Sequence, residues 1–492
     1  MGVVTVYSSA LFSARYVRSR PGQGVTTASV AWRWVVPLAT GAVILALPRA
    51  GFSMQAWGLL SLFAATIVAL ITRPIAAGAV AIVALTTGSL LRLFTVQEAL
   101  AGYANVTIWL IVAAFMFARG FAESHLGERI AYSIVRRLGG RPLGLGYAIV
   151  LADLAMAPMT PSNTARAGGI LFPITLNIAR AFGSEPGPTA SRIGQFLMQT
   201  LFQGDLVVSA MFLTATAPNP LVAEFARQGA GVDVSWAMWA LAALVPGLVS
   251  LAIVPWVIHR LCPPVLHETR AAQVLAAERL EAMGPLRRAE WIMLSIFGLV
   301  LGLWLTGEWH GASPTSIALL GISLMLLTRV LEWNDLVEEK GAWDALIWFG
   351  GVLTMSTQLE KAGLPRAFAG VAAAFVDGWP WWWALVGLLV IYLYAHYAFA
   401  SLVAHVTAMF PAFLAAALVL GAPPLVAVLS FGFFSSLNAA TTHYGSGPAP
   451  IVFGAGYLTQ TAWWRIGFLI SLLHLAVWLP LGFLWWRVLG LW

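Results

Sequence analysis

The feature that most restricts the fold is an interruption of the apolar chain at residues 158–173, which reads Pro-Met-Thr-Pro-Ser-Asn-Thr-Ala-Arg-Ala-Gly-Gly-Ile-Leu-Phe-Pro. Pro158 and Pro161 each remove a backbone donor and restrict the residue before them. Ser162, Asn163 and Thr164 then supply good N-cap side chains for a new helix. The pattern predicts a helix that stops at membrane depth and starts again. Such a break is tolerated only where it lines a cavity or is buried in protein, so it indicates a binding site.

Composition indicates that the surrounding chain is a membrane protein. Only 10% of its residues are charged and 60% are hydrophobic, with a mean hydropathy of +0.83. Soluble domains carry about a quarter charged residues. Apolar stretches of about 17–22 residues recur along the chain, each long enough to cross about 30 Å of hydrocarbon. The predicted fold class is therefore an all-α polytopic membrane protein, with the lipid bilayer as its surroundings and no separate soluble domain.

Several functional classes are excluded by the same composition. Cys262 is the single cysteine, so the chain has no internal disulfide and a metal-thiolate cluster is not expected. The net charge of +7 is spread over short loops rather than one exposed domain, so nucleic acid is not an expected partner. The chain contains no H-E-x-x-H, nucleotide loop or ligand-spaced His and acidic cluster. This argues against a membrane enzyme, a primary pump, a bound metal and a cofactor.

Polar stretches and breaks divide the chain into two membrane halves joined by a linker rich in arginine. The predicted segments are a tail at 1–32, a first half at 33–258 with a hairpin at 142–183 and a broken helix near 214–220, a linker at 259–290, and a second half at 291–492 with a hairpin at 380–419 and a broken helix near 438–450.

The distribution of Lys and Arg predicts the orientation. With the N-terminus inside, Arg73, Arg119 and the linker arginines lie on one side. The opposite loops hold few basic residues, chiefly Arg49, Lys361 and Arg366. The positive-inside rule then places the N-terminus in the cytoplasm and the C-terminus in the periplasm of a bacterial inner membrane. The first 97 residues contain no Asp or Glu and include a basic tail. That composition resembles a transit peptide, so a plastid inner membrane is the alternative.

The two halves carry the same landmarks in the same order. An Ile-Trp-aromatic or Ile-Trp-Leu triplet precedes a Glu and an Arg six residues apart, and a Pro-rich break follows later in each half. The landmarks are residues 108–110, Glu123, Arg129 and 215–220 in the first half, and 347–349, Glu360, Arg366 and 444–450 in the second. By the span count the halves enter from opposite faces, and paired breaks in inverted halves indicate the central site of a transporter. A chance alignment of apolar segments is the alternative.

The breaks predict a site for an anion. Each helix N-terminus carries about half a positive charge, so four half-helix starts around one cavity approach about +2 as an upper bound, which suits a dianion. Arg166 follows Asn163 by three residues, and an arginine at this depth is functional by default, with an ion pair to Asp153 as the alternative. His405 shares a helical face with Ser401, and for this histidine and His443 the alternative is a packing role. The candidate substrate ligands are Ser162, Asn163, Thr164, Arg166, Thr216, Pro218, Asn219, Ser401, His405, Thr407, His443, Ser446, Gly447 and Pro448.

Residues 157–169, which contain Pro158 to Arg166, and Tyr444-Gly445-Ser446-Gly447-Pro448-Ala449-Pro450 resemble the divalent anion/sodium symporter family. The resemblance runs from about residue 33 to the end and is strongest to the branch of the plastid 2-oxoglutarate/malate translocator and the bacterial citrate/succinate and tartrate/succinate antiporters. It implies about eleven transmembrane helices, two re-entrant hairpins, a homodimer and elevator-type movement. It also implies that Ser-Asn-Thr signatures at both hairpin tips bind substrate carboxylates.

The second signature departs from the family pattern, because Ser401 is followed by Leu402 and Val403. These two side chains offer no oxygen, so a second sodium site is not expected, although sodium coupling stays the alternative. Our hypothesis is that Arg166 and His405, with His443, provide fixed positive charge instead, and that unpaired buried charge prevents the empty carrier from reorienting. The predicted function is therefore sodium-independent exchange of carboxylates such as malate, succinate, 2-oxoglutarate, citrate or tartrate. A channel would need no mirrored anion-binding breaks.

Overall fold

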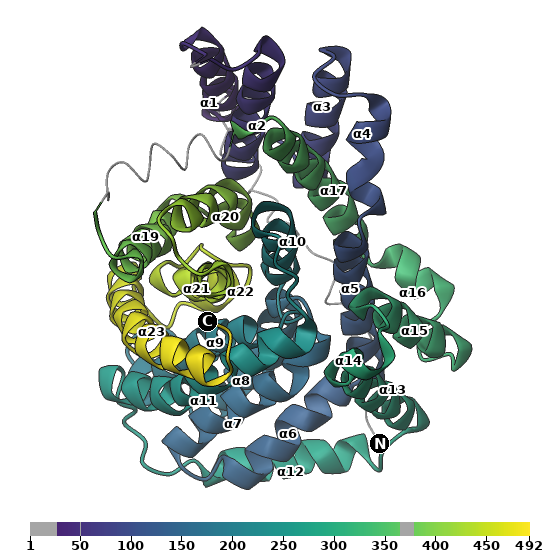
Figure 1. Cartoon of the computed structure of the whole chain (residues 1–492). Coiled ribbons are helices and arrows are strands. Elements are labelled where there is room, and N and C mark those ends of the chain that lie inside the picture. Colours follow the sequence, from purple (N-terminus) through teal and green to yellow (C-terminus); the bar gives the residue numbers. More distant parts are fainter. Residues whose placement is uncertain (1–26, 50, 365–377) are drawn as a thin grey trace.

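The computed structural model describes residues 27–49, 51–364 and 378–492, and every regular element in these ranges is a helix (Figure 1). The first half contains α1 (Thr27–Ala46), α2 (Met54–Thr72), α3 (Ala77–Leu90), α4 (Val96–Ala101), η1 (Gly102–Ala104), α5 (Val106–Ser124), α6 (Leu126–Leu138), α7 (Pro142–Met156), η2 (Ala157–Met159), η3 (Thr164–Leu171), α8 (Phe172–Ala181), η4 (Ala190–Arg192), α9 (Gly194–Met211), α10 (Pro218–Ala230) and α11 (Trp236–Leu261). The linker and second half contain α12 (Arg270–Met283), α13 (Arg288–Leu305), α14 (Gly307–His310), α15 (Pro314–Leu327), α16 (Trp333–Glu338), α17 (Lys340–Lys361), α19 (Trp381–Ala395), η5 (His396–Ala398), α20 (Leu402–Val419), α21 (Pro424–Leu437), η6 (Asn438–Thr441), α22 (Pro448–Gly454) and α23 (Gln460–Val488).

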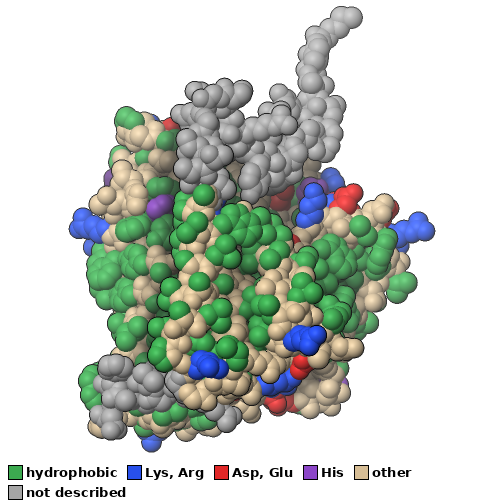
Figure 2. All heavy atoms as spheres, turned by 90° about the horizontal axis from the view of Figure 1, so that it is seen from above, with side chains coloured by type: hydrophobic (Ala, Val, Ile, Leu, Met, Phe, Trp, Pro, Cys, Tyr) green, Lys and Arg blue, Asp and Glu red, His purple; other side chains and the backbone are tan. Residues whose placement is uncertain are grey.

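The surface is that of a multi-pass membrane protein. Within the described ranges, eight helices are long and apolar enough to cross a membrane. Figure 2 shows a broad apolar face, with charged side chains mostly toward its edge. Of the predicted N-terminal tail, residues 1–26 lie outside the described residues, and the rest already belongs to α1.

The order of elements repeats between the halves. In the first, α5 is followed by the helix α7, a tip, the pair η3 and α8, the broken helix α9–α10, and α11. In the second, α17 is followed by α19, a tip, α20, the broken helix α21–α22, and α23. Both tips begin with a short 3₁₀ turn, η2 and η5. Arg366, one of the sequence landmarks, lies outside the described residues.

The halves support each other through crossed packing. The second part of the first broken helix, α10, packs against α20 of the second hairpin (Figure 1). The second part of the other broken helix, α22, packs against η3 of the first hairpin. Each broken helix therefore holds the hairpin tip of the opposite half, which brings all four breaks to one place.

The described helices form two hydrophobic cores of unequal size. The smaller core joins side chains of α2, α3 and α4 to the C-terminal part of α17, with Trp57, Leu85, Val352 and Met355 among its buried members. The larger core contains both hairpins and both broken helices. Phe349 of α17 belongs to the larger core, so α17 forms the wall between two bodies.

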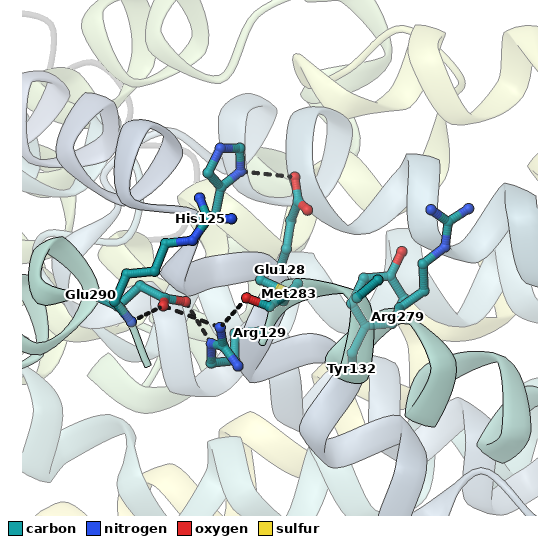
Figure 3. Close-up of a pocket in the computed structure, with 9 residues that line it drawn as sticks. His125, Glu128, Arg129, Tyr132, Arg279, Met283 and Glu290 are labelled. Carbon is teal, nitrogen blue, oxygen red and sulfur yellow. Dashed lines mark hydrogen bonds and ion pairs between the residues drawn. The ribbon is translucent and has the colours of Figure 1, made fainter. Parts of the chain in front are cut away.

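The linker contains a helix, α12, that packs along the amphipathic α6. Arg129 of α6 donates from Nε to Glu290 Oε1 at 2.5 Å (Figure 3). Its Nη1 donates to the Gly284 carbonyl at 3.0 Å. These contacts surround a pocket of about 250 Å³, lined also by His125 and Arg279. Arg129 therefore anchors the linker to α6.

Close approach of α23 to the second break gives the first prediction. A Cβ on Gly467 would lie 2.1 Å from the backbone oxygen of Ala440, which has no side-chain freedom with which to retreat. We expect Gly467→Ala to destabilise the protein by about 1–3 kcal/mol, as overpacking does, and to lower the midpoint of thermal unfolding in detergent. Gly298→Ala on α13, with no atom within 4 Å of the added methyl, is the matched control. Equal midpoints for the two variants would contradict this packing.

Candidate functional site

The first tip is built by a serine that restarts the helix. After η2 the chain is extended at Thr160, and then Ser162 Oγ accepts a hydrogen bond from the Ala165 amide at 3.1 Å. The Arg166 amide donates to the Ser162 carbonyl at 2.9 Å. The first turns, η3, are π-helical before α8 continues the segment, a wider turn that is frequent at functional sites. The predicted N-cap role of Ser162 is thus present in the structure.

The second tip uses the same device. Ser401 has extended backbone angles, and its Oγ accepts from the Ala404 amide at 3.4 Å. The His405 amide donates to the Ser401 carbonyl at 3.1 Å. A capping serine accepts with one lone pair and keeps its own hydrogen to donate. Both tips therefore place a hydroxyl donor at the start of a helix.

A cavity of about 510 Å³ lies where the two tips and the two broken helices meet. The candidate ligands that line it are Ser162, Asn163, Thr164, Thr216, Pro218, Ser401, Ser446 and Gly447. Their contact with a substrate stays a prediction, but the cavity joins residues from four separate parts of the sequence.

Two buried donors in this wall lack a partner among the described residues, Asn163 Nδ2 and Ser446 Oγ. Their residues are 6% and 3% exposed, respectively. Leaving a buried polar group unpaired costs about 1–3 kcal/mol, so such groups require an explanation. Gly447 lets the second broken helix approach the first tip, since a Cβ there would lie 1.8 Å from Thr164 Oγ1.

Arg166, predicted to bind the substrate, does not line this cavity. Its side chain is fully buried, and Nε donates to Asp153, the partner that the alternative reading named. Nη2 donates to Asp205 Oδ1 at 2.8 Å and to Ser209 Oγ at 3.0 Å. Nη1 donates to two backbone oxygens, so all three guanidinium nitrogens are occupied by the protein. The guanidinium has no donor group directed at the cavity.

His405 is likewise buried behind the second tip and does not line the cavity. Its Nδ1 lies 2.8 Å from His396 Nδ1 and 2.8 Å from Asn438 Nδ2. His396 Nε2 in turn lies 2.9 Å from the Gly445 carbonyl. The packing alternative therefore describes His405 better, because its contacts tie the tip to the second broken helix.

Four other candidates also lie outside the cavity lining. Asn219 is buried and donates to the carbonyls of Ser209 and Phe212 at 2.8 and 2.9 Å, which stabilises the first break. His443 accepts from Trp464 Nε1 at 2.9 Å. Thr407 faces a different pocket, between α20, α2 and α17, and Pro448 is buried at the start of α22. These positions shape the site rather than forming its wall.

Sequence reasoning missed three large side chains that line the cavity: Arg73, Phe115 and Tyr444. Tyr444 was noted only as part of the second motif, and Arg73 only as a charge that sets orientation. The usable signal at Arg73 was an arginine followed directly by Pro74 at the end of an apolar span. The first tip offers a cation the side-chain oxygens of Ser162, Asn163 and Thr164. At the second tip, the side chains of Leu402 and Val403 contain no oxygen.

Comparison with known proteins identifies the family. Residues 28–492 match the family model described as the sodium:sulfate symporter transmembrane region. The chain belongs to the divalent anion/sodium symporter family. It is 47% identical to a putative malate transporter of Bacillus subtilis, over 93% of this chain and 96% of that protein. It is 35% identical to the citrate/succinate antiporter of Escherichia coli K12, over 94% and 98% of the two chains.

Two further comparisons agree. Chloroplastic dicarboxylate transporter 1 of Arabidopsis thaliana is 42% identical, over 96% of this chain and 87% of that one. The crystal structure of the Alcanivorax borkumensis YdaH transporter, at 14% identity, shares the fold with a TM-score of 0.54, covering 94% of this chain and 98% of its own. This symporter-family protein is therefore a transporter and not an enzyme.

The ion pairs of Arg166 with Asp153 and Asp205 predict that one substitution destabilises the protein and another does not. Arg166→Met leaves Asp153 and Asp205 buried without their cation, which costs about 3–5 kcal/mol. We expect little folded protein and a strongly lowered unfolding midpoint. Asp205→Asn, the matched control, keeps an oxygen acceptor for Nη2 and removes one of two negative charges, so its midpoint should stay near that of the parent. Size-exclusion profiles and thermal unfolding in detergent measure both, and a stable Arg166→Met protein would contradict the structural role.

Proposed function

We propose that this protein exchanges dicarboxylates across a bacterial inner membrane without sodium coupling, by an elevator movement of its hairpin-bearing body. The proposal is supported by the names of its relatives, which include a putative malate transporter, dicarboxylate transporters and a citrate/succinate antiporter. The observation that carries it is the cavity between two serine-capped tips, with unpaired donors from both halves in its wall.

The electrostatics of the cavity suit a dianion. Three helices of eight or more residues, η3, α20 and α10, begin at Thr164, Leu402 and Pro218, and all three residues line the cavity. At about half a charge each, these N-termini supply about +1.5 as an upper bound. Backbone amides and hydroxyls from opposite walls can each receive one carboxylate, which is the geometry a C4 or C5 dicarboxylate needs.

The second tip supports independence from sodium. A sodium site needs several oxygens, and the positions that follow Ser401 carry the apolar side chains of Leu402 and Val403, 5% and 9% exposed, respectively. The first tip keeps its oxygens, so a sodium-coupled symporter is the alternative that the experiment below must separate.

The protein exchanges substrates because reorienting the carrier with an empty site costs free energy. The earlier hypothesis of unpaired fixed charge does not fit Arg166, because two carboxylates face that guanidinium. The buried donors of Asn163 and Ser446 offer a different cause, since they stay unpaired until a carboxylate accepts from them. Carrying unpaired donors and helix N-termini past an apolar wall is unfavourable, and a bound dianion removes that cost.

The two hydrophobic cores support an elevator movement. The cavity is lined by residues of the hairpins and broken helices, which belong to the larger core, and by Arg73 at the end of α2, a helix of the smaller core. Separate cores allow one body to slide against the other without opening either. We propose that the body with the smaller core is the fixed scaffold, that the protein is a homodimer, and that the N-terminus is cytoplasmic and the C-terminus periplasmic.

Counterflow in proteoliposomes tests exchange. Vesicles loaded with unlabelled succinate and held in choline buffer should take up labelled succinate or 2-oxoglutarate, with malate, citrate and tartrate competing to different degrees. Anion-free vesicles should take up little, because the empty carrier does not return. Uptake into anion-free vesicles driven by a sodium gradient would overturn the exchange model in favour of the symporter.

The first tip predicts a defined loss of affinity. Asn163→Ala and Ser162→Ala remove the amide donor and the capping hydroxyl of the cavity wall. Each should lower counterflow at least about tenfold at subsaturating succinate, as expected for a lost hydrogen bond to a charged group. Ser295→Ala on α13, whose exposed hydroxyl bonds only its own helix at Trp291, is the control and should transport like the parent. Normal transport by both tip variants would contradict the site.

A further inference from the structure

We propose that Arg73 is an additional substrate-binding residue, which contacts the bound dianion from the body opposite the hairpin tips and therefore only at one end of the transport cycle. This inference deepens the proposed function and rests on it. Arg73 lines the 510 Å³ cavity together with Ser162, Asn163 and Ser401.

Local structure directs the Arg73 side chain away from its helix. Arg73 is the residue after α2, its amide donates to the Ala69 carbonyl at 2.8 Å, and its backbone is left-handed at φ 50° and ψ 57°. Pro74 follows and prevents the helix from continuing. The left-handed conformation is a common way to end a helix, and here it makes Arg73 the C-cap of α2.

The Arg73 guanidinium is available for a ligand. Among the residues that the structure describes, no carboxylate lies within 4.0 Å of it, and its side chain is exposed. Asp344 lines a neighbouring cavity together with Arg73, but its Oδ1 lies against Gly78 in the first turn of α3, 3.0 Å from the position of a Cβ there. An anionic side chain is stabilised at a helix N-terminus, so Asp344 has its own partner.

A second cavity makes Arg73 part of an approach to the site. This space, of about 690 Å³, shares Arg73 and Ser401 with the first and is lined also by Arg33 and Asp344. Two arginines and one carboxylate leave an excess of positive charge along its wall. Such a wall attracts a dicarboxylate toward the tips, and a guanidinium can then donate two hydrogen bonds to one carboxylate.

The position of Arg73 separates it from the other ligands. Arg73 ends α2, whose side chains Trp57 and Leu59 belong to the smaller core, whereas both tips are part of the body with the larger core. If the hairpin body carries the substrate away, Ser162 and Asn163 travel with it and Arg73 does not. The contact with Arg73 is therefore made in the state described here and lost in the other, so it raises affinity at one membrane face only.

The test replaces the charge and then restores it chemically. We expect Arg73→Cys to raise the KM for succinate counterflow roughly tenfold when substrate is added at one face, as for a lost charge-assisted contact. The KM at the other face should be unchanged, and so should the maximal rate. Right-side-out and inside-out membrane vesicles give the two faces. Treatment with 2-aminoethyl methanethiosulfonate, which attaches an ammonium group, should restore most of the lost affinity, whereas the sulfonatoethyl reagent should not.

The chain offers a matched control. Arg92 lies two residues after the last residue of α3, is also left-handed with φ 59° and is also exposed, yet it lines none of the cavities described here. Arg92→Cys should keep the parent KM at both faces. The native thiol does not interfere, because Cys262 is buried and burial raises its pKa to about 11, so it stays protonated and unreactive at neutral pH.

The outcomes distinguish this inference from the proposed function. An unchanged KM in Arg73→Cys at both faces, an equal rise at both faces, or equal rescue by the two reagents would overturn the role of Arg73 while parental counterflow still supports exchange. Absence of counterflow in the parent protein would instead overturn the proposed function. Slower modification of Arg73→Cys in the presence of succinate, but not of Arg92→Cys, would support direct contact.

Discussion

The fold depends on one buried guanidinium that satisfies backbone groups which two helix breaks leave open. Where helices stop in an apolar environment, their carbonyls lose intrahelical partners and water is not at hand to replace them. Arg166 donates to the carbonyl of Thr160 in the first tip at 2.8 Å and to that of Ala215 in the first broken helix at 2.9 Å. Asp153 and Asp205 hold its charge from α7 and α9. A single side chain thus joins a tip, a broken helix and the two helices that lead to them, and the cavity wall cannot keep its shape without it.

The second half solves the same problem with a neutral network. His405 lies four residues after its tip serine, as Arg166 does, and connects Asn438 to His396. His396 reaches the Gly445 carbonyl of the second break, and Gln203 of α9 donates to the Ala440 carbonyl at 3.2 Å. Arg166 and His405, at corresponding positions in the two repeats, therefore each connect a hairpin tip to a broken helix, one through ion pairs and the other through a histidine. Both stand one helical turn behind the cavity, where they can fix the orientation of the tip without contacting what the tip holds.

Sequence patterns predicted the elements well and the direction of side chains poorly. Proline, serine and glycine restrict the backbone locally, so Pro158, Pro161 and Ser162 were enough to locate the first break and its cap. Helical spacing could not decide whether Arg166 faced the cavity or Asp153, because it predicts a shared face and not which neighbours surround that face. The crossed packing of α10 on α20 and of α22 on η3 depends on contacts between distant segments, which no local pattern contains. For the same reason the sequence placed Arg73 in a loop and did not predict that this loop reaches the tips.

The unpaired donors lie at the first tip and at the second break, so the cavity has a rigid support behind it and a wall with free hydrogen-bond donors. Arg166 and His405 are each held by several neighbours behind the tips, while Asn163 Nδ2 and Ser446 Oγ have no partner among the described residues. A wall that could repack would pair its own donors, and the empty carrier would then move as readily as the loaded one. The rigid contacts behind the tips prevent these donors from finding a partner within the protein. A bound anion can accept hydrogen bonds from them. The strength of coupling between substrate binding and movement should thus depend on residues that never touch the substrate.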